Sequence, residues 1–164
     1  LGGESPRAYV DRLARAKAAA GWRRVERENL PRAPVLGADT TVALDGRILG
    51  KPADDREAAA MLAVLSGRLH EVLTAVAVKH ESWLESAVSV SEVRFKALTG
   101  EEIARYVATG ECEDKAGAYG IQGHAARFVA ELRGSFSGVV GLPLYETAQL
   151  LERMGAQRER RNPR

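Results

Sequence analysis

The sequence has little of several features that mark particular protein classes. A single cysteine, Cys112, excludes an internal disulfide framework and suits the reducing cytoplasm. No apolar run approaches the roughly 18 residues that a membrane-spanning helix needs, so no membrane association is expected. Neither charge sign dominates: the formal net charge is +2, and acidic and basic residues are interspersed. A nucleic-acid-binding protein would carry a concentrated basic face, so no nucleic-acid partner is expected.

The segment from Glu111 to Gly123 is the most informative part of the chain. It places Glu111, Asp114 and Lys115 just before a glycine-rich stretch that contains Gln122. Carboxylates can hold a hard cation, and glycines let backbone N–H groups approach an anion. The Gln122 amide can read the edge of a base. The segment indicates a metal-assisted nucleotide site, although a charged helix end followed by a glycine-rich turn explains these residues equally well.

A second segment, residues 37–52, combines a strand pattern with isolated polar residues. Apolar residues lead into Asp39, and alternation then continues to an Asp45-Gly46 turn, which predicts a hairpin. This pattern places Asp39 at a strand end, where ligands tend to bind in open α/β sheets. Turn capping is the alternative role for Asp39. Lys51 precedes a proline, which favours an extended backbone at Lys51.

The pattern along the chain predicts one α/β domain over residues 1–164. Helices are expected over residues 6–20, 54–66, 99–108 and 142–154, with a polar loop over 22–33. Strands are expected over residues 35–49 (a pair), 72–78, 83–95 and 128–132. Because helices alternate with strands while short turns join several strands, we predict a mixed sheet flanked by helices.

Together these segments resemble the Maf family of nucleoside triphosphate pyrophosphatases. The residues that carry the resemblance are Gly37-Ala38-Asp39-Thr40, Gly50-Lys51-Pro52, Leu65 to Arg68 with His70-Glu71-Val72 and Thr74, Asp114 to Gly123, and Val140 to Leu144. The resemblance implies a Maf/ITPase-like fold and metal-dependent hydrolysis, with Mg²⁺ or Mn²⁺, of a nucleoside triphosphate to the monophosphate and pyrophosphate. Lys115-Ala116-Gly117 and Ile121-Gln122-Gly123 are similar to the branch acting on dTTP and UTP; modified pyrimidine nucleotides are further candidate substrates.

The resemblance also implies roles for individual residues. Asp39 is expected to be the catalytic base and to help Glu111 and Asp114 hold the cation. The expected phosphate contacts are Lys51, Lys115 and Lys17, and the expected specificity residues are Thr40 and Gln122. His70 and Thr74 match family positions as well, and we expect His70 to be structural.

The start of the chain departs from the family pattern. Family members begin with a strand and a Ser-x-Ser-Pro-Arg-Arg loop that holds the triphosphate, and Ser5-Pro6-Arg7 invites that assignment. However, Tyr9-Val10 and Lys17-Ala18 match a later helix motif of the family, and Ser5 with Pro6 suits a helix start. We therefore expect residues 1–164 to lack the N-terminal strand and phosphate loop, which puts the activity of this chain alone in question.

Two other functions compete with the pyrophosphatase hypothesis. The first is a non-catalytic, nucleotide-binding regulator of cell division and septum formation, which a missing phosphate loop would favour. The second is a generic phosphatase or kinase, which fits less well because the chain has no Walker-type or kinase signature. Family members are often dimers, so a homodimer is one expected assembly.

Overall fold

The computed structural model describes residues 3–161, with side chains described for residues 3–157. Its centre is a five-stranded sheet with the strand order β2-β1-β3-β4-β5. The strands are β1 (Val35–Leu44), β2 (Arg47–Leu49), β3 (Leu69–His80), β4 (Trp83–Phe95) and β5 (Val129–Arg133). The helices are α1 (Pro6–Arg27), α2 (Asp55–Leu65), α3 (Gly100–Val107), α4 (Phe136–Val140) and α5 (Leu144–Arg161), with short 3₁₀ turns η1 (Ala116–Ala118) and η2 (His124–Phe128).

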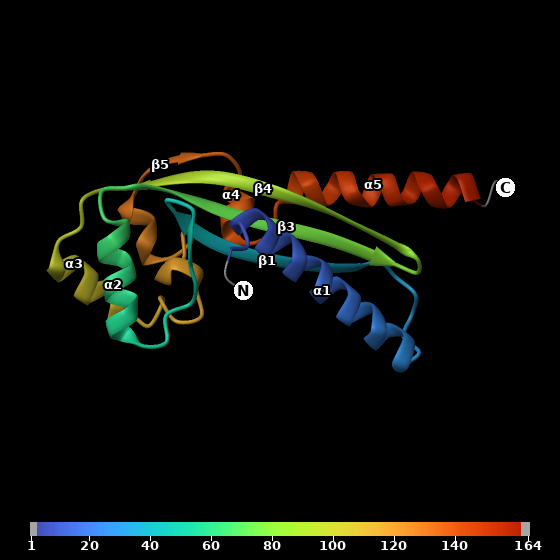
Figure 1. Cartoon of the computed structure of the whole chain (residues 1–164), viewed down its shortest axis with the longest axis horizontal. Coiled ribbons are helices and arrows are strands. Elements are labelled where there is room, and N and C mark those ends of the chain that lie inside the picture. Colours follow the sequence, from blue (N-terminus) through green and yellow to red (C-terminus); the bar gives the residue numbers. More distant parts are fainter. Residues whose placement is uncertain (1–2, 162–164) are drawn as a thin grey trace.

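The expected α/β fold, a sheet flanked by helices, is confirmed. We expected a mixed sheet, whereas the four described pairings are all antiparallel. The tight turns β1–β2 and β3–β4 account for two of these pairings, because a short turn reverses the chain direction. Helix α1 lies on one face of the sheet, α4 and α5 lie on the other, and α2 and α3 gather at one end (Figure 1).

The side chains of strand β3 alternate between the two faces of the sheet and contribute to the apolar core on each face. Leu73, Ala75 and Ala77 belong to the apolar cluster formed with α1, whereas Val76 and Val78 pack with the α5 residues. Successive side chains of a strand point to opposite faces, so one buried strand supports two cores. A third and larger cluster joins α2, α3 and η2 to the end of the sheet.

Helix α1 is longer than the sequence pattern predicted. It was expected to end at Ala20, but it continues to Arg27. Trp22 explains the difference, because its side chain is buried and its ring lies 5.3 Å from the His80 ring. The helix start was predicted well, since Ser5 caps it and Pro6 follows.

A glycine lets α1 approach β1 at backbone distance. A Cβ at Gly37 would lie 2.4 Å from the Ala18 nitrogen and 2.5 Å from the Ala14 oxygen. No side chain fits between these two backbones, so Gly37 fixes how closely the helix crosses the strand. This contact also carries Lys17, the neighbour of Ala18, to the middle of β1.

Other local predictions were confirmed, and one helix was missed. Asp54 caps α2, and Thr99 with Glu102 forms the capping box of α3. The hairpin turn lies at Asp45-Gly46, both with positive φ, as the sequence indicated. Helix α4, one and a half turns long, was not predicted, because its glycine and β-branched residues form no helical pattern.

The first part of β1 forms an open edge of the sheet. Strand β2 pairs only with residues 42–44 of β1, so among residues 3–161 the segment 35–41 has a strand partner on the β3 side alone. The prediction that Asp39 lies at a strand end was wrong: it lies within β1, opposite Ala75. The polar Asp39-Thr40 pair interrupts the apolar pattern because it borders an open edge, without ending the strand.

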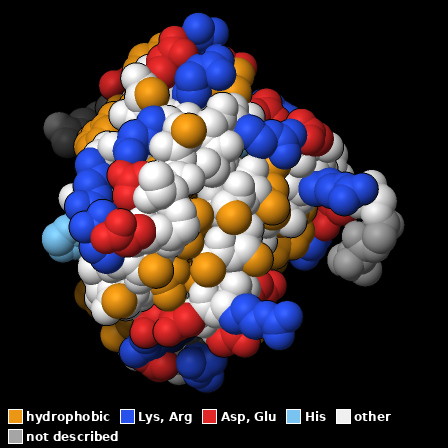
Figure 2. Space-filling model, turned by 90° about the vertical axis from the view of Figure 1, so that its left-hand side faces the viewer, with side chains coloured by type: hydrophobic (Ala, Val, Ile, Leu, Met, Phe, Trp, Pro, Cys, Tyr) orange, Lys and Arg blue, Asp and Glu red, His pale blue; other side chains and the backbone are white. Residues whose placement is uncertain are grey.

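The surface shows no concentration of one charge on the face drawn in Figure 2. Lys and Arg side chains alternate there with Asp and Glu around scattered apolar atoms (Figure 2). Within the described part of the chain, no helix has the length and apolar character to span a bilayer.

Candidate active site

A cavity of about 580 Å³ lies at the open edge of β1. Its walls come from α1, from β1, from the loop after β2, from residues 114–122 and from α4. Seven of the eight predicted site residues line it: Lys17, Asp39, Thr40, Lys51, Asp114, Lys115 and Gln122. Residues separated by up to about a hundred positions in the sequence therefore share one cavity, and Glu111 is the one predicted member outside it.

The cavity extends over both faces of the sheet at the β1 edge. Asp39 lies opposite Ala75, a residue of the α1 cluster, so its side chain is on the α1 face. Thr40 lies opposite Thr74, which contacts α4, so its side chain is on the α4 face. The period of two along a strand thus assigns the predicted base and the predicted specificity residue to opposite faces.

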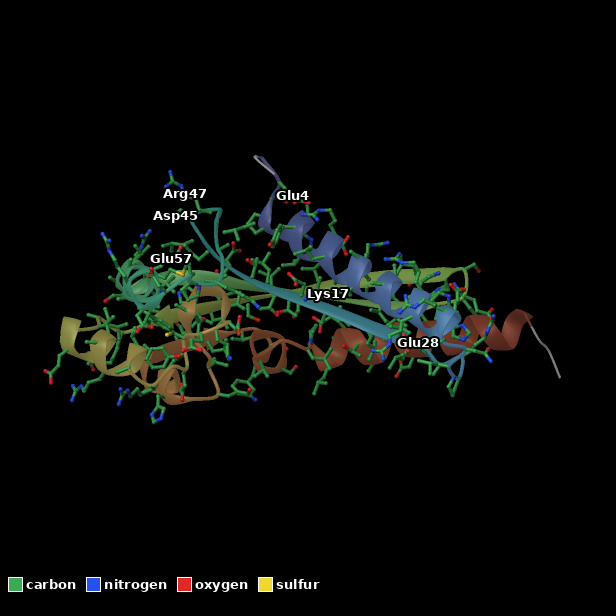
Figure 3. All side chains as sticks on the ribbon, turned by 90° about the horizontal axis from the view of Figure 1, so that it is seen from below. Glu4, Lys17, Glu28, Asp45, Arg47 and Glu57 are labelled. Atoms are coloured by element: carbon green, nitrogen blue, oxygen red, sulfur yellow. The ribbon has the colours of Figure 1, made fainter. Side chains whose placement is uncertain are left out.

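On the α1 face, Lys17 holds Asp39. Lys17 Nζ lies 2.6 Å from Asp39 Oδ1 and donates to the Ala38 carbonyl oxygen over 2.9 Å. Only 14% of the Asp39 side chain is exposed. Figure 3 shows Lys17 at the junction of α1 and β1. One ammonium group thus contacts both the Asp39 carboxylate and the backbone carbonyl beside it, which holds the carboxylate in position.

The loop side of the cavity consists of residues 50–51, after β2, and residues 114–122. There Lys51 and Asp114 form a looser pair. Lys51 Nζ lies 3.7 Å from Asp114 Oδ1, and the two side chains are 64% and 89% exposed. The backbone brings them together, because the Gly117 N–H donates to the Gly50 carbonyl oxygen over 3.0 Å. Gly117 has φ 68°, and a Cβ there would lie 2.9 Å from Val42 Cγ2, so a side chain would disturb this junction.

Lys115 crosses the glycine-rich segment that follows it. A Cβ at Gly120 would lie 3.4 Å from Lys115 Cε, so the glycine leaves a path for the lysine side chain. The Gly120 N–H donates to the Tyr106 hydroxyl over 3.2 Å, which ties the segment to a buried ring. Burial raises the pKa of Tyr106 to about 12. Gln122 is exposed at the cavity rim.

Beneath the loop side, Tyr119 is anchored on His70. The Tyr119 hydroxyl lies 2.9 Å from His70 Nε2, and both side chains are buried. Burial lowers the pKa of His70 to about 4, so the imidazole is neutral at pH 7. Burial also raises the pKa of Tyr119. His70 does not line the cavity, and these contacts give it the structural role that we expected.

Glu111 serves a different part of the structure. Its Oε2 accepts a hydrogen bond of 2.8 Å from the His124 N–H, and its Oε1 lies 3.6 Å from His124 Nε2. The carboxylate also packs against Gly123, where a Cβ would lie 2.3 Å from Oε2. Glu111 thus caps the η2 turn and points away from the cavity-lining set, although it is close in sequence to Asp114.

Several cavity residues had no assigned role at the sequence level. Tyr9, Tyr119 and the α4 residues Val139 and Val140 supply apolar walls. Tyr9 and Tyr119 lie inside the family-like motifs, so the motifs were the available signal. Thr74 matched a family position and lies 2.8 Å, between hydroxyl oxygens, from Thr40.

The cavity offers two carboxylates, Asp39 and Asp114, as cation ligands. Within residues 3–161 no group of three or more His, Cys, Asp or Glu is arranged to hold a metal ion. Mg²⁺ usually keeps several waters and binds through one or two carboxylates together with substrate phosphates. A set of two carboxylates beside three lysines therefore fits a cation that arrives with a phosphate ligand.

Comparisons with known proteins show similarity along most of the chain. The family model described as "Maf-like protein" matches residues 2–154. A protein of Aromatoleum aromaticum named dTTP/UTP pyrophosphatase is 60% identical over 153 residues, which cover 93% of this chain and 74% of that protein. Proteins with the same name from Dechloromonas aromatica and Nitrosomonas europaea are 56% identical (94% of this chain, 77% of the relative) and 53% identical (93% and 73%).

Proposed function

The chain belongs to the Maf-like protein family, and on that premise we propose that it is a nucleoside triphosphate pyrophosphatase acting on dTTP and UTP. The products are the nucleoside monophosphate and pyrophosphate. One observation carries the proposal: the cavity at the β1 edge gathers a carboxylate that is only 14% exposed, three lysines and two candidate base-reading residues from separate parts of the sequence. Modified pyrimidine nucleotides are included in the proposed substrate range.

The proposed chemistry occurs on the α1 face of the cavity. Asp39 takes a proton from the water that attacks one phosphorus of the α–β linkage. The bond from that phosphorus to the bridging oxygen breaks, which releases the monophosphate and pyrophosphate. Lys17 keeps the carboxylate in place through its contact of 2.6 Å, so no side-chain reorganisation is needed at the moment of reaction. Because Oδ1 contacts Lys17, Oδ2 is the oxygen proposed to accept the proton.

The triphosphate is proposed to lie along the lysines. Lys17, Lys51 and Lys115 line one cavity, and their charges offset those of the phosphates. Asp39 and Asp114 would hold a divalent cation, Mg²⁺ or Mn²⁺, which when bound neutralises phosphate charge and orients the chain of phosphates. Glu111 is left out of this set because its carboxylate caps η2.

The base is proposed to lie on the α4 face, against Thr40 and Gln122. Gln122 offers a donor pair and an acceptor at the rim, and Thr40 offers a hydroxyl at the β1 edge. A site that hydrogen-bonds a particular base rejects one that leaves its polar groups unpaired. Val139 and Val140 supply apolar surface beside the base.

We also propose that the protein is a cytoplasmic homodimer that binds no nucleic acid. The buried free thiol of Cys112 fits a reducing compartment. The exposed apolar side chains of Phe136, Leu144 and Tyr145, on α4 and the start of α5, supply a surface for a second copy. Sedimentation velocity of the wild type and of Phe136→Ser tests this, and a wild-type monomer at all concentrations would contradict it.

The test of the proposed activity is pyrophosphate release from a panel of dTTP, UTP, dCTP, dATP and dGTP with Mg²⁺ or Mn²⁺. Two forms are compared: residues 1–164, and the same chain preceded by a family strand and Ser-x-Ser-Pro-Arg-Arg segment. Release from dTTP and UTP above the other nucleotides in either form supports the proposal. Absence of release from both folded forms, with nucleotide still bound, would instead favour the regulatory function.

A further inference from the structure

Three groups form a chain of hydrogen bonds behind the base-binding side of the cavity. Thr40 Oγ1 lies 2.8 Å from Thr74 Oγ1, and Thr74 Oγ1 lies 2.7 Å from the Gly138 carbonyl oxygen. The three groups come from β1, β3 and α4. Thr74 is 1% exposed and does not line the cavity, whereas Thr40 does.

Counting protons fixes the direction of this chain. A carbonyl oxygen only accepts, so the Thr74 hydroxyl donates its single proton to Gly138. Thr74 then has only lone pairs for Thr40. The bond between the two hydroxyls must therefore be donated by Thr40, whose only proton points toward Thr74 and away from the cavity.

The consequence reaches the cavity wall. With its proton engaged, Thr40 Oγ1 presents only lone pairs to a bound base, and a threonine that could otherwise donate or accept becomes an acceptor. Uracil and thymine carry a proton on N3 and can donate to such an oxygen. Cytosine has a bare N3, which would place two acceptors against each other.

We propose that Thr74 is a positioning residue that turns the Thr40 hydroxyl into an obligate acceptor and so selects bases with an N3–H. The inference rests on the proposed function, because it assumes that a pyrimidine nucleotide is the ligand. It goes beyond that function in assigning selectivity to a residue that touches no substrate. Thr74 is buried within the sheet, and its bond to Gly138 of α4 directs its proton away from Thr40, through which it reaches the base.

Matched variants separate this role from packing. Thr74→Val keeps the branched shape and removes the hydroxyl, so Thr40 is free to rotate and donate. Thr74→Ser keeps both hydrogen bonds and removes only a methyl group. Val76→Ala perturbs a buried neighbour on the same strand face that does not line the cavity, so it reports the effect of looser packing alone.

The experiment measures kcat/KM for dTTP and dCTP, and Kd for non-hydrolysable analogues of both, in the form of the protein that releases pyrophosphate. Thr74→Val is expected to lower the preference for dTTP about tenfold, which corresponds to one unsatisfied buried hydrogen-bonding group. Thr74→Ser and Val76→Ala are expected to keep the wild-type preference. In the Thr40→Val background, Thr74→Val should change the preference no further, because the residue it positions is gone.

A substrate analogue keeps the test decisive where Thr74→Val does not fold. Wild-type protein is expected to bind 3-methyl-dTTP, which lacks the N3 proton, at least tenfold more weakly than dTTP. Equal affinity for the two, or an unchanged dTTP preference in folded Thr74→Val, would overturn the inference. Loss of hydrolysis of every nucleotide by the wild type would overturn the proposed function instead, since the Kd ratios are measured without turnover.

Discussion

Two ammonium–carboxylate pairs border the cavity, and the fold holds them very differently. Lys17 and Asp39 lie 2.6 Å apart between a packed helix and strand, whereas Lys51 and Asp114 lie 3.7 Å apart on loops and are mostly exposed. An exposed pair at that separation contributes little to the free energy of folding, so Lys51 and Asp114 can separate at low cost when each binds part of a ligand. Lys17 and Asp39 therefore hold their positions before substrate arrives. Lys51 and Asp114 are held loosely, and we expect them to become ordered when the phosphates and the cation bind.

Among these substitutions, the replacement of Asp39 is expected to have the largest effect. Asp39→Asn keeps the shape of the side chain but removes the base, so pyrophosphate release is expected to fall by about 10²- to 10⁴-fold while nucleotide binding is retained. Assays of pyrophosphate release measure the loss of turnover, and equilibrium binding measures the affinity for nucleotide. Asp45→Asn makes the same charge change at the exposed hairpin turn and should leave turnover unchanged. Wild-type turnover in Asp39→Asn would remove Asp39 from the mechanism.

The sequence supported the identities of these residues better than their positions. Lys17 and Asp39 were assigned roles through motifs, but their contact depends on the close approach at Gly37, which no local pattern reveals. Asp39 was expected at a strand end because an open edge and a strand end both interrupt an apolar pattern. Glu111 looked like a neighbour of Asp114, yet the turn at residues 110–114 sends the two carboxylates in different directions.

A bulkier residue at Gly37 should separate the helix from the strand. In Gly37→Ala the added Cβ would meet backbone atoms of α1 at 2.4 and 2.5 Å, so we expect the free energy of unfolding to fall by about 3 kcal/mol. Urea unfolding measures this. Gly155→Ala is the control, because Gly155 lies within α5 with open space around it and should gain up to about 1 kcal/mol. Equal effects of the two substitutions would contradict the packing argument.

The two lysines should differ in which kinetic constant they control. Lys17→Met removes the group that holds Asp39, so kcat is expected to fall roughly 30-fold. Lys51→Met removes a loosely held phosphate contact, so KM should rise about tenfold with kcat nearly retained. Steady-state kinetics on dTTP separate the two. A fall in kcat confined to Lys51→Met would contradict the assignment of Lys17 to holding the base and of Lys51 to binding phosphate.

The loop side should be the acid-sensitive one, because Tyr119 depends on neutral His70. The pKa of His70 is about 4 in the folded protein against an ordinary value of 6.5, so the unfolded chain binds the extra proton first. Stability is therefore complete above pH 6.5 and is lost as pH falls, by about 2 kcal/mol between pH 7 and pH 5. Urea unfolding at several pH values in that range gives the free energy of unfolding as a function of pH. This free energy should fall less steeply with decreasing pH in His70→Phe than in the wild type. Parallel slopes would exclude His70 as the source.

The central claim is that alternation along β1 separates the reaction from base recognition. Its most direct test measures hydrolysis of dTTP, and binding of non-hydrolysable dTTP and dCTP analogues, in Asp39→Asn and Thr40→Val. We predict that Asp39→Asn loses hydrolysis but still binds the dTTP analogue in preference, and that Thr40→Val still hydrolyses dTTP but binds both analogues alike. Loss of hydrolysis and of preference together in either variant would contradict the account.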